Sequence, residues 1–277
     1  MAKPSRSLVD HTADVVTAFV ALFGTEENPN DFTRRWLAFF RLNEGDLTPF
    51  LRNAQLACWV HDWGKANTGF AGMLARTAVQ AVRHEVVSAL IMTQPQVWRW
   101  LENAERVDLP LVLAAVAGHH LKAAEPEGWG DAKQFGTNQA GALNSDFALT
   151  WNHPKIRDQI ALLAKEFGIE GPLPDGVLED WSSGRRGPNT AHYPDERARA
   201  CKRIKQFLRE IEDDHASNGS RILRAVRSAL IAADSAGSAL FRTHEETGRT
   251  DEVRPHIRQW IADAFDPAAR LDGAKVH

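Results

Sequence analysis

Residues 47–70 read LTPFLRNAQLACWVHDWGKANTGF, an apolar segment that runs into a cluster of polar residues. Its apolar side chains recur at the spacing of one buried helix face, at Leu47, Phe50, Leu51, Ala54 and Cys58. The pattern predicts a helix that ends near Gly64. His61 and Asp62 therefore lie at its end, and the pattern His-Asp-x-Gly-Lys indicates a chemical role for that end.

The helical pattern extends from this segment in both directions. Asp31 is the expected N-cap of DFTRRWLAFFRL, and further apolar-periodic segments are HEVVSALIMT, PQVWRWLENAE, LPLVLAAVAGHH, PKIRDQIALLAKEF, DERARACKRIKQFLREIED, SRILRAVRSALIAADSAGSALF and VRPHIRQWIADAF. Strand patterns are scarce, so we expect an all-α domain of about ten helices, given a typical helix of about 11–12 residues. We expect a single domain over residues 1–277, with a loop-rich insertion at 122–194 and a C-terminal helical tail at 242–277.

Composition narrows the class of protein. The 277 residues are 43% hydrophobic and 25% charged, which is ordinary for a globular protein and excludes a disordered or collagen-like chain. The net charge of −3 shows no global basic excess, so any nucleic-acid binding must use a local patch. Two distant cysteines, Cys58 and Cys201, argue against a disulfide framework. No apolar run approaches the ~18 residues of a membrane span, so we expect a cytoplasmic protein without membrane contact.

The histidines carry the chemical information. His11 lies in the first predicted helix, His84 begins another, and the pair His119–His120 ends an apolar helix, while Asp234 lies in AADSAGSAL. Each of them alone has an ordinary reading as a solvated or hydrogen-bonded side chain. Together with His61 and Asp62, they are costly to bury unless they are paired or bind metal. Imidazole and carboxylate suit Mn, Fe, Co, Ni or Zn, and seven ligands suit two ions that share one carboxylate.

The motifs HDWGKANTGF, RHE, AGHH and AADSAGS together resemble those of the HD metal-dependent phosphohydrolase superfamily. They are most similar to the HD nuclease domain of the CRISPR-associated nuclease-helicase of type I interference. The resemblance runs from His11 to Ser238 and implies an HD helical bundle with a dinuclear metal site. The segment between His120 and Asp234 is longer than we expect in compact members of this family. The match of Asp234 therefore depends on treating part of that segment as an insertion.

The resemblance implies a role for each matching residue. One ion would be held by His11, His61, Asp62 and Asp234, and the second by Asp62, His84, His119 and His120. Asp62 would thus bridge the two ions and act in catalysis with Lys65, and Lys65 and Ser238 would line the path of the phosphate. Lys65 has the alternative reading of an ordinary exposed lysine. The ions would be transition metals such as Mn, Fe, Co or Ni in preference to Mg.

The resemblance also implies a substrate and partners. Domains of this family cut single-stranded DNA that a helicase motor feeds to them, alongside an RNA-guided surveillance complex. The chain contains no G-x-x-x-x-G-K-[ST] sequence, so the motor must lie elsewhere, and the chain is either a separate subunit or the nuclease part of a longer protein. Arg185 and Arg186 are candidate DNA contacts, and Trp63 and Trp129 are candidates for stacking on bases.

Two other functions fit the sequence. An HD phosphohydrolase acting on nucleotides or cyclic nucleotides would use the same ligands with a closed nucleoside pocket. A non-catalytic adaptor would keep the HD fold only to recruit partners. The complete set of ligands argues against the adaptor.

Overall fold

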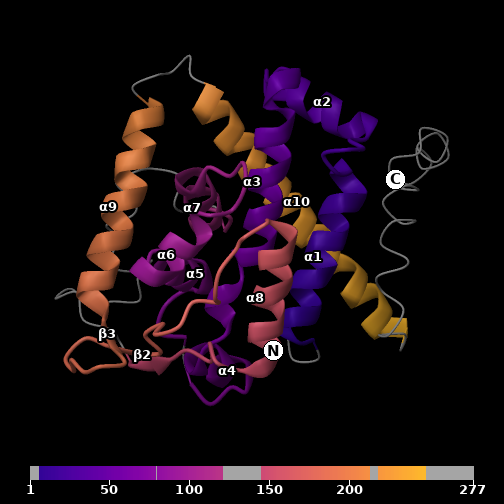
Figure 1. Ribbon diagram of the computed structural model, residues 1–277. Coiled ribbons are helices and arrows are strands. Elements are labelled where there is room, and N and C mark those ends of the chain that lie inside the picture. Colours follow the sequence, from indigo (N-terminus) through magenta and orange to yellow (C-terminus); the bar gives the residue numbers. More distant parts are fainter. Residues whose placement is uncertain (1–5, 79, 121–144, 213–217, 248–277) are drawn as a thin grey trace.

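The computed structural model describes residues 6–78, 80–120, 145–212 and 218–247, and they form a helical domain with a small sheet (Figure 1). The α-helices are α1 (Leu8–Phe23), α2 (Asp31–Phe39), α3 (Leu47–Val60), α4 (Thr68–Leu74), α5 (His84–Met92), α6 (Pro95–Leu101), α7 (Leu109–Ala117), α8 (Pro154–Glu166), α9 (Tyr193–Glu212) and α10 (Asn218–Thr247). Two short 3₁₀ turns are η1 (Glu44–Asp46) and η2 (Trp63–Lys65). The predicted all-α class is confirmed. Among these residues, no helix is both long enough and apolar enough to cross a membrane.

Helices α1, α3, α7 and α10 form the centre of the domain, and α10 packs against the other three. In Figure 1, α10 passes behind α3 and α1, while α9 lies on the other side of α5, α6 and α7 and packs against α5 and α7. The core side chains include Val15 and Phe19 of α1, Leu56 of α3 and Leu230 of α10, all buried. Their burial at helical spacing explains why the sequence pattern predicts these helices correctly.

Helix α10 approaches α1 closely at Gly237. A Cβ atom at this glycine would lie 3.0 Å from the backbone nitrogen of Val15 and 3.1 Å from the carbonyl carbon of Asp14. The missing side chain therefore lets the two backbones approach closely. Because Asp234 and His11 lie about one turn away on their helices, this contact sets the distance between them.

The N-terminus of α2 differs slightly from the prediction. The N-cap is Asn30, whose side chain accepts a hydrogen bond from the backbone nitrogen of Thr33, and Asp31 is the first residue of the helix. Both residues are good N-caps. Asn30 also donates to the carbonyl of Leu22 at 2.7 Å, and this contact with α1 fixes it as the cap.

The segment expected to be a loop-rich insertion contains regular structure where the model describes it. Helix α8 buries Ile156, Ile160 and Leu163. Three short strands, β1 (Phe147–Ala148), β2 (Asp180–Ser182) and β3 (Thr190–His192), form a sheet in the order β1-β2-β3, with β1 antiparallel and β3 parallel to β2. Residues 121–144, which include Trp129, lie outside the described residues.

The described part of the C-terminal tail continues α10 as far as Thr247. The predicted helix VRPHIRQWIADAF lies outside the described residues.

Candidate metal centre

The His-Asp pair follows directly after α3. His61 is the C-cap residue of this helix, and its Nδ1 lies 2.9 Å from the carbonyl oxygen of Cys58. A proton on Nδ1 satisfies that carbonyl and leaves Nε2 as the free lone pair. His61 is fully buried and Asp62 is 1% exposed. The end of α3 thus presents one imidazole nitrogen and one carboxylate to the interior.

The first cluster joins α1, the end of α3 and α10. His11 Nε2 lies 3.1 Å from Asp62 Oδ2 and 3.2 Å from Asp234 Oδ1, and His61 Nε2 lies 3.3 Å from Asp62 Oδ2. The donor atoms of His11, His61 and Asp62 all lie within 4.8 Å of one another, close enough for one ion to bind them, and Asp234 adds an oxygen next to His11. All four residues that the sequence predicts for the first metal are therefore brought together.

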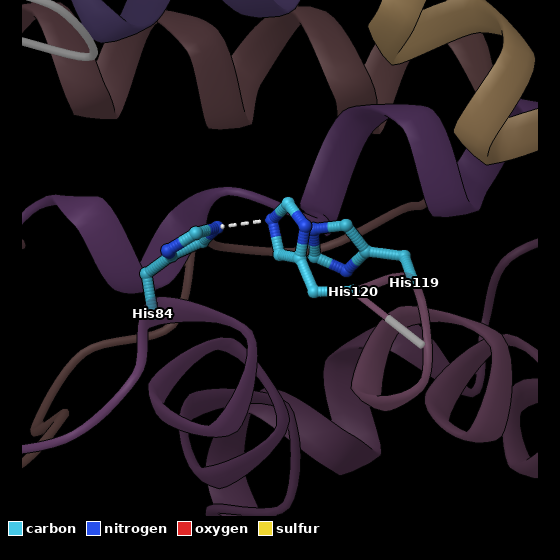
Figure 2. A group of neighbouring side chains, drawn as sticks. All are labelled: His84, His119 and His120. Carbon is cyan, nitrogen blue, oxygen red and sulfur yellow. Dashed lines mark hydrogen bonds between the residues drawn. The ribbon is translucent and has the colours of Figure 1, made fainter. Parts of the chain in front are cut away.

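The second cluster joins the start of α5 to the turn after α7 (Figure 2). His84 Nε2 lies 2.9 Å from His120 Nε2, and the donor atoms of His84, His119 and His120 all lie within 4.8 Å of one another. His119 Nδ1 lies 2.5 Å from the carbonyl of Val116, which directs its Nε2 away from the helix. The histidines predicted for the second metal also converge.

Asp62 lies between the two clusters. Its Oδ2 is the oxygen near His11 and His61, while its Oδ1 lies 3.3 Å from His84 Nε2. One carboxylate thus offers a different oxygen to each cluster. This is the arrangement that a bridging ligand between two ions requires.

The electrostatics of the clusters favour metal binding. Burial lowers the pKa of His84 well below its usual value, and burial and the neighbouring His61 and His120 lower the pKa of His119 to about 3. Both imidazoles are thus neutral near pH 7, which is the form that binds metal. Burial alone would raise the pKa of Asp62, but the neighbouring His61 and Lys65 hold it well below its usual value. Asp62 is therefore ionised near pH 7.

The donor set fits transition-metal ions. His11 Nε2, His61 Nε2, His119 Nε2 and Asp62 Oδ1 are buried and make no hydrogen bond. Buried polar atoms without partners cost free energy, and a metal ion bound between them would offset that cost. Imidazole and carboxylate together suit Mn, Fe, Co, Ni or Zn better than Mg or Ca.

Lys65 and Ser238 both lie at the first cluster. Lys65 Nζ is 2.6 Å from Asp62 Oδ2 and its side chain is largely buried, so the reading as an ordinary exposed lysine is wrong. The hydroxyl of Ser238 donates to Asp234 Oδ1 at 3.3 Å. Each touches one of the predicted ligands, and contact with a phosphate stays a prediction for both.

Trp63 does not fit its predicted role in stacking on bases. It is 2% exposed, and its ring packs edge-on against Trp151 with centroids 5.2 Å apart. The backbone nitrogen of Thr150 also donates to the carbonyl of Ala66 at 2.8 Å. The segment after β1 thus packs against the turn that carries His61 and Asp62, and Trp63 takes part in this packing.

Arg185 and Arg186 lie in the connection between β2 and β3 and are exposed. Arg185 lies 3.7 Å from a carboxylate oxygen of Asp180, and Arg186 lies 3.3 Å from one of Asp195. Exposed pairs of this kind are weak, so they leave both side chains available to a phosphate. Their contact with DNA stays a prediction.

Ser88 of α5 supports the site and was missed from the sequence. Its hydroxyl donates to the carbonyl of His61 at 2.6 Å and accepts from the backbone nitrogen of Gly64 at 2.8 Å. Because α5 begins with His84, this one side chain ties the His-Asp turn to the helix that carries the second cluster. A serine in an apolar helix gives no local signal of such a contact.

The fold and the site define a helical domain with two neighbouring His/Asp clusters that share one carboxylate. A model of the family described as "Cas3, HD domain" matches residues 2–173, more than half of the chain. The chain belongs to this family. The match contains His11, His61, Asp62, His84, His119 and His120, whereas Asp234 lies beyond it.

One curated relative supports the same assignment. It is described as "Putative CRISPR-associated nuclease/helicase Cas3" from Myxococcus xanthus (strain DK1622), and it is 31% identical over 227 residues. The alignment covers 76% of this chain and 27% of the relative, so the chain spans about a quarter of that protein's length. No solved structure matches the chain.

Proposed function

We propose that the chain is a metal-dependent nuclease that cleaves single-stranded DNA in CRISPR type I interference and acts with a separate helicase activity. The observation that carries the proposal is Asp62, whose two oxygens face two clusters of imidazole nitrogens. Two bound ions would clamp a phosphate and lower the pKa of a water that attacks the phosphorus in line. The family and the description of the Myxococcus xanthus relative support DNA as the substrate.

Side chains from several helices would hold the ions and contact the phosphate. Five histidines and two aspartates would hold the ions, and they lie on α1, α5 and α10 and in the turns after α3 and α7. Lys65 neutralises part of the charge on Asp62 at 2.6 Å and would remain within reach of a phosphate oxygen. Ser238 orients Asp234 through its hydrogen bond.

Single strands are the expected substrate because the chain has no motor sequence to unwind a duplex. A metal site formed at helix ends requires one flexible strand to reach it. The helicase and the RNA-guided surveillance complex would supply that strand. The relative is named as a nuclease/helicase, and the chain spans only about a quarter of it. This supports a nuclease part that acts with a separate helicase part.

Metal dependence of cleavage tests the proposal. We expect EDTA to abolish cutting of a labelled single strand, and Mn, Co, Ni or Fe to restore it much better than Mg, because Mg binds imidazole reluctantly. The measurement is the initial cleavage rate after readdition of each metal to EDTA-treated protein. Equal rescue by Mg would contradict the assignment of His84, His119 and His120 as ligands.

The form of the DNA gives a second prediction. The chain alone, without ATP, should cut the single strand and leave the same sequence largely intact in a blunt duplex. Gel analysis of the two substrates at equal concentration measures the difference. Efficient cutting of the blunt duplex would contradict the proposal, and hydrolysis of cyclic nucleotides without cleavage of DNA would favour the phosphohydrolase alternative.

A further inference from the structure

Arg227 lies on α10 seven residues before Asp234. Seven residues are about two helical turns, so the two side chains leave the same face of α10, about 10 Å apart along its axis. Helix α10 packs against α7 on its way to the metal centre. Arg227 therefore lies on the face of α10 that also carries Asp234.

The neighbour of Arg227 is the end of α7. A Cβ atom at Gly118 would lie 3.2 Å from the Cδ of Arg227 and 3.4 Å from its Nη1. Gly118 directly precedes His119 and His120, the two ligands that α7 supplies to the second cluster. The guanidinium thus lies against the residue next to the metal ligands.

The charge of Arg227 has no partner within the part of the chain that the structure describes. Its side chain is half-buried, and burial lowers its pKa, with no carboxylate acting in the opposite direction. The other arginines of this stretch differ, because Arg221 donates to the carbonyl of Arg41 and exposed Arg224 donates to the carbonyl of Ser220, each at 3.2 Å. A partly desolvated charge without a partner is costly, and an anion that binds there would offset the cost.

We propose that Arg227 binds a phosphate of the substrate strand next to the one that is cleaved, and so positions the strand over the two clusters. The inference rests on the proposed nuclease function and names a contact beyond the metal ligands. A planar guanidinium can donate two parallel hydrogen bonds to one phosphate, which fixes the direction of the strand as well as its distance.

A purely structural role is the competing explanation. The carbonyl groups at the C-terminus of α7 carry partial negative charge, and a cation beside them stabilises the helix. In that case Arg227 would matter for folding and not for DNA. The two roles differ in their response to salt, because only a phosphate contact releases a counterion from DNA.

Binding of a fluorescent 20-nucleotide oligodeoxythymidylate tests the inference. The full chain is titrated in EDTA, which prevents cleavage, at several salt concentrations. We expect Arg227→Gln to weaken binding about tenfold at low salt and to reduce the slope of log K against log[salt] by about 0.7, the value of one phosphate contact in a single strand. Arg227→Lys should retain the slope, and the control Arg224→Gln should match the wild type.

Cleavage kinetics with Mn²⁺ provide a second readout. Arg227→Gln should raise KM with little change in kcat, because the contact is made to the bound strand before and during cleavage. If the wild type binds the strand and Arg227→Gln keeps its slope and KM while its melting temperature falls, the structural role is correct and the inference is wrong. If the wild type neither binds nor cuts the strand, the proposed function itself fails, and the inference with it.

Discussion

Replacing Asp62 by alanine should abolish cleavage while the helical fold persists. Asp62 is the residue whose carboxylate faces both clusters, so its loss removes a ligand from each site at once. Substitutions outside the ligand shell of metal sites already cost about 10–100-fold, so we expect the cleavage rate to fall at least about a thousandfold here. The measurement is the initial rate on a labelled single strand, and the far-ultraviolet circular dichroism spectrum reports the fold.

A matched control is the same substitution at Asp175. This carboxylate is 86% exposed and pairs with Arg157 at 3.3 Å, so Asp175→Ala should cut at the wild-type rate. Asp62→Ala with near-normal cutting would contradict the assignment of Asp62 as the bridge.

Replacing Gly64 by alanine should strongly destabilise the folded domain. The added Cβ would overlap the carbonyl oxygen of His84 and would lie 2.6 Å from the backbone nitrogen of Ser88. These are backbone atoms that cannot rotate away, so the turn and α5 must separate. We expect a loss of about 3 kcal/mol in the free energy of unfolding, which lowers the melting temperature by roughly 6–12 °C in a chain of this size. Thermal unfolding followed by circular dichroism measures it.

The control for Gly64 is Gly184, in the connection after β2. A Cβ atom there meets nothing within 4 Å, so Gly184→Ala should leave the melting temperature nearly unchanged. Gly64→Ala should also impair metal binding, since it displaces the turn that carries Asp62 from the helix that begins with His84. An unchanged melting temperature for Gly64→Ala would show that the turn does not pack against α5 as described.

Most of the candidate metal ligands could be predicted from the sequence because they lie beside a recognisable helix boundary. His61 and Asp62 follow an apolar stripe, His84 follows a break before an apolar segment, and His119 follows a fully apolar helix. The structure shows the reason, since α3, α5 and α7 direct these ends to one place. The match of Asp234 was less certain because a long segment separates it from His120. It lies within a helix, and its position depends on the close approach of α10 to α1 at Gly237.

Contacts between segments far apart in the sequence could not be predicted. Trp63 stands beside the His-Asp pair, yet Trp151 buries it, and no local pattern indicates that partner. Ser88 is hydrogen-bonded to the turn that carries His61 from another helix, and no local pattern indicates this contact either. The three strands were missed because they contain only two or three residues each, too few to show an alternating pattern.

The number of metal ions bound per chain tests the central claim most directly. The protein is loaded with Mn or Ni, freed of unbound metal, and analysed by inductively coupled plasma mass spectrometry together with Asp62→Ala. A shared carboxylate between two imidazole clusters predicts two ions in the wild type and fewer than one in the variant. One ion or none in the wild type, or two ions in Asp62→Ala, would contradict the dinuclear site.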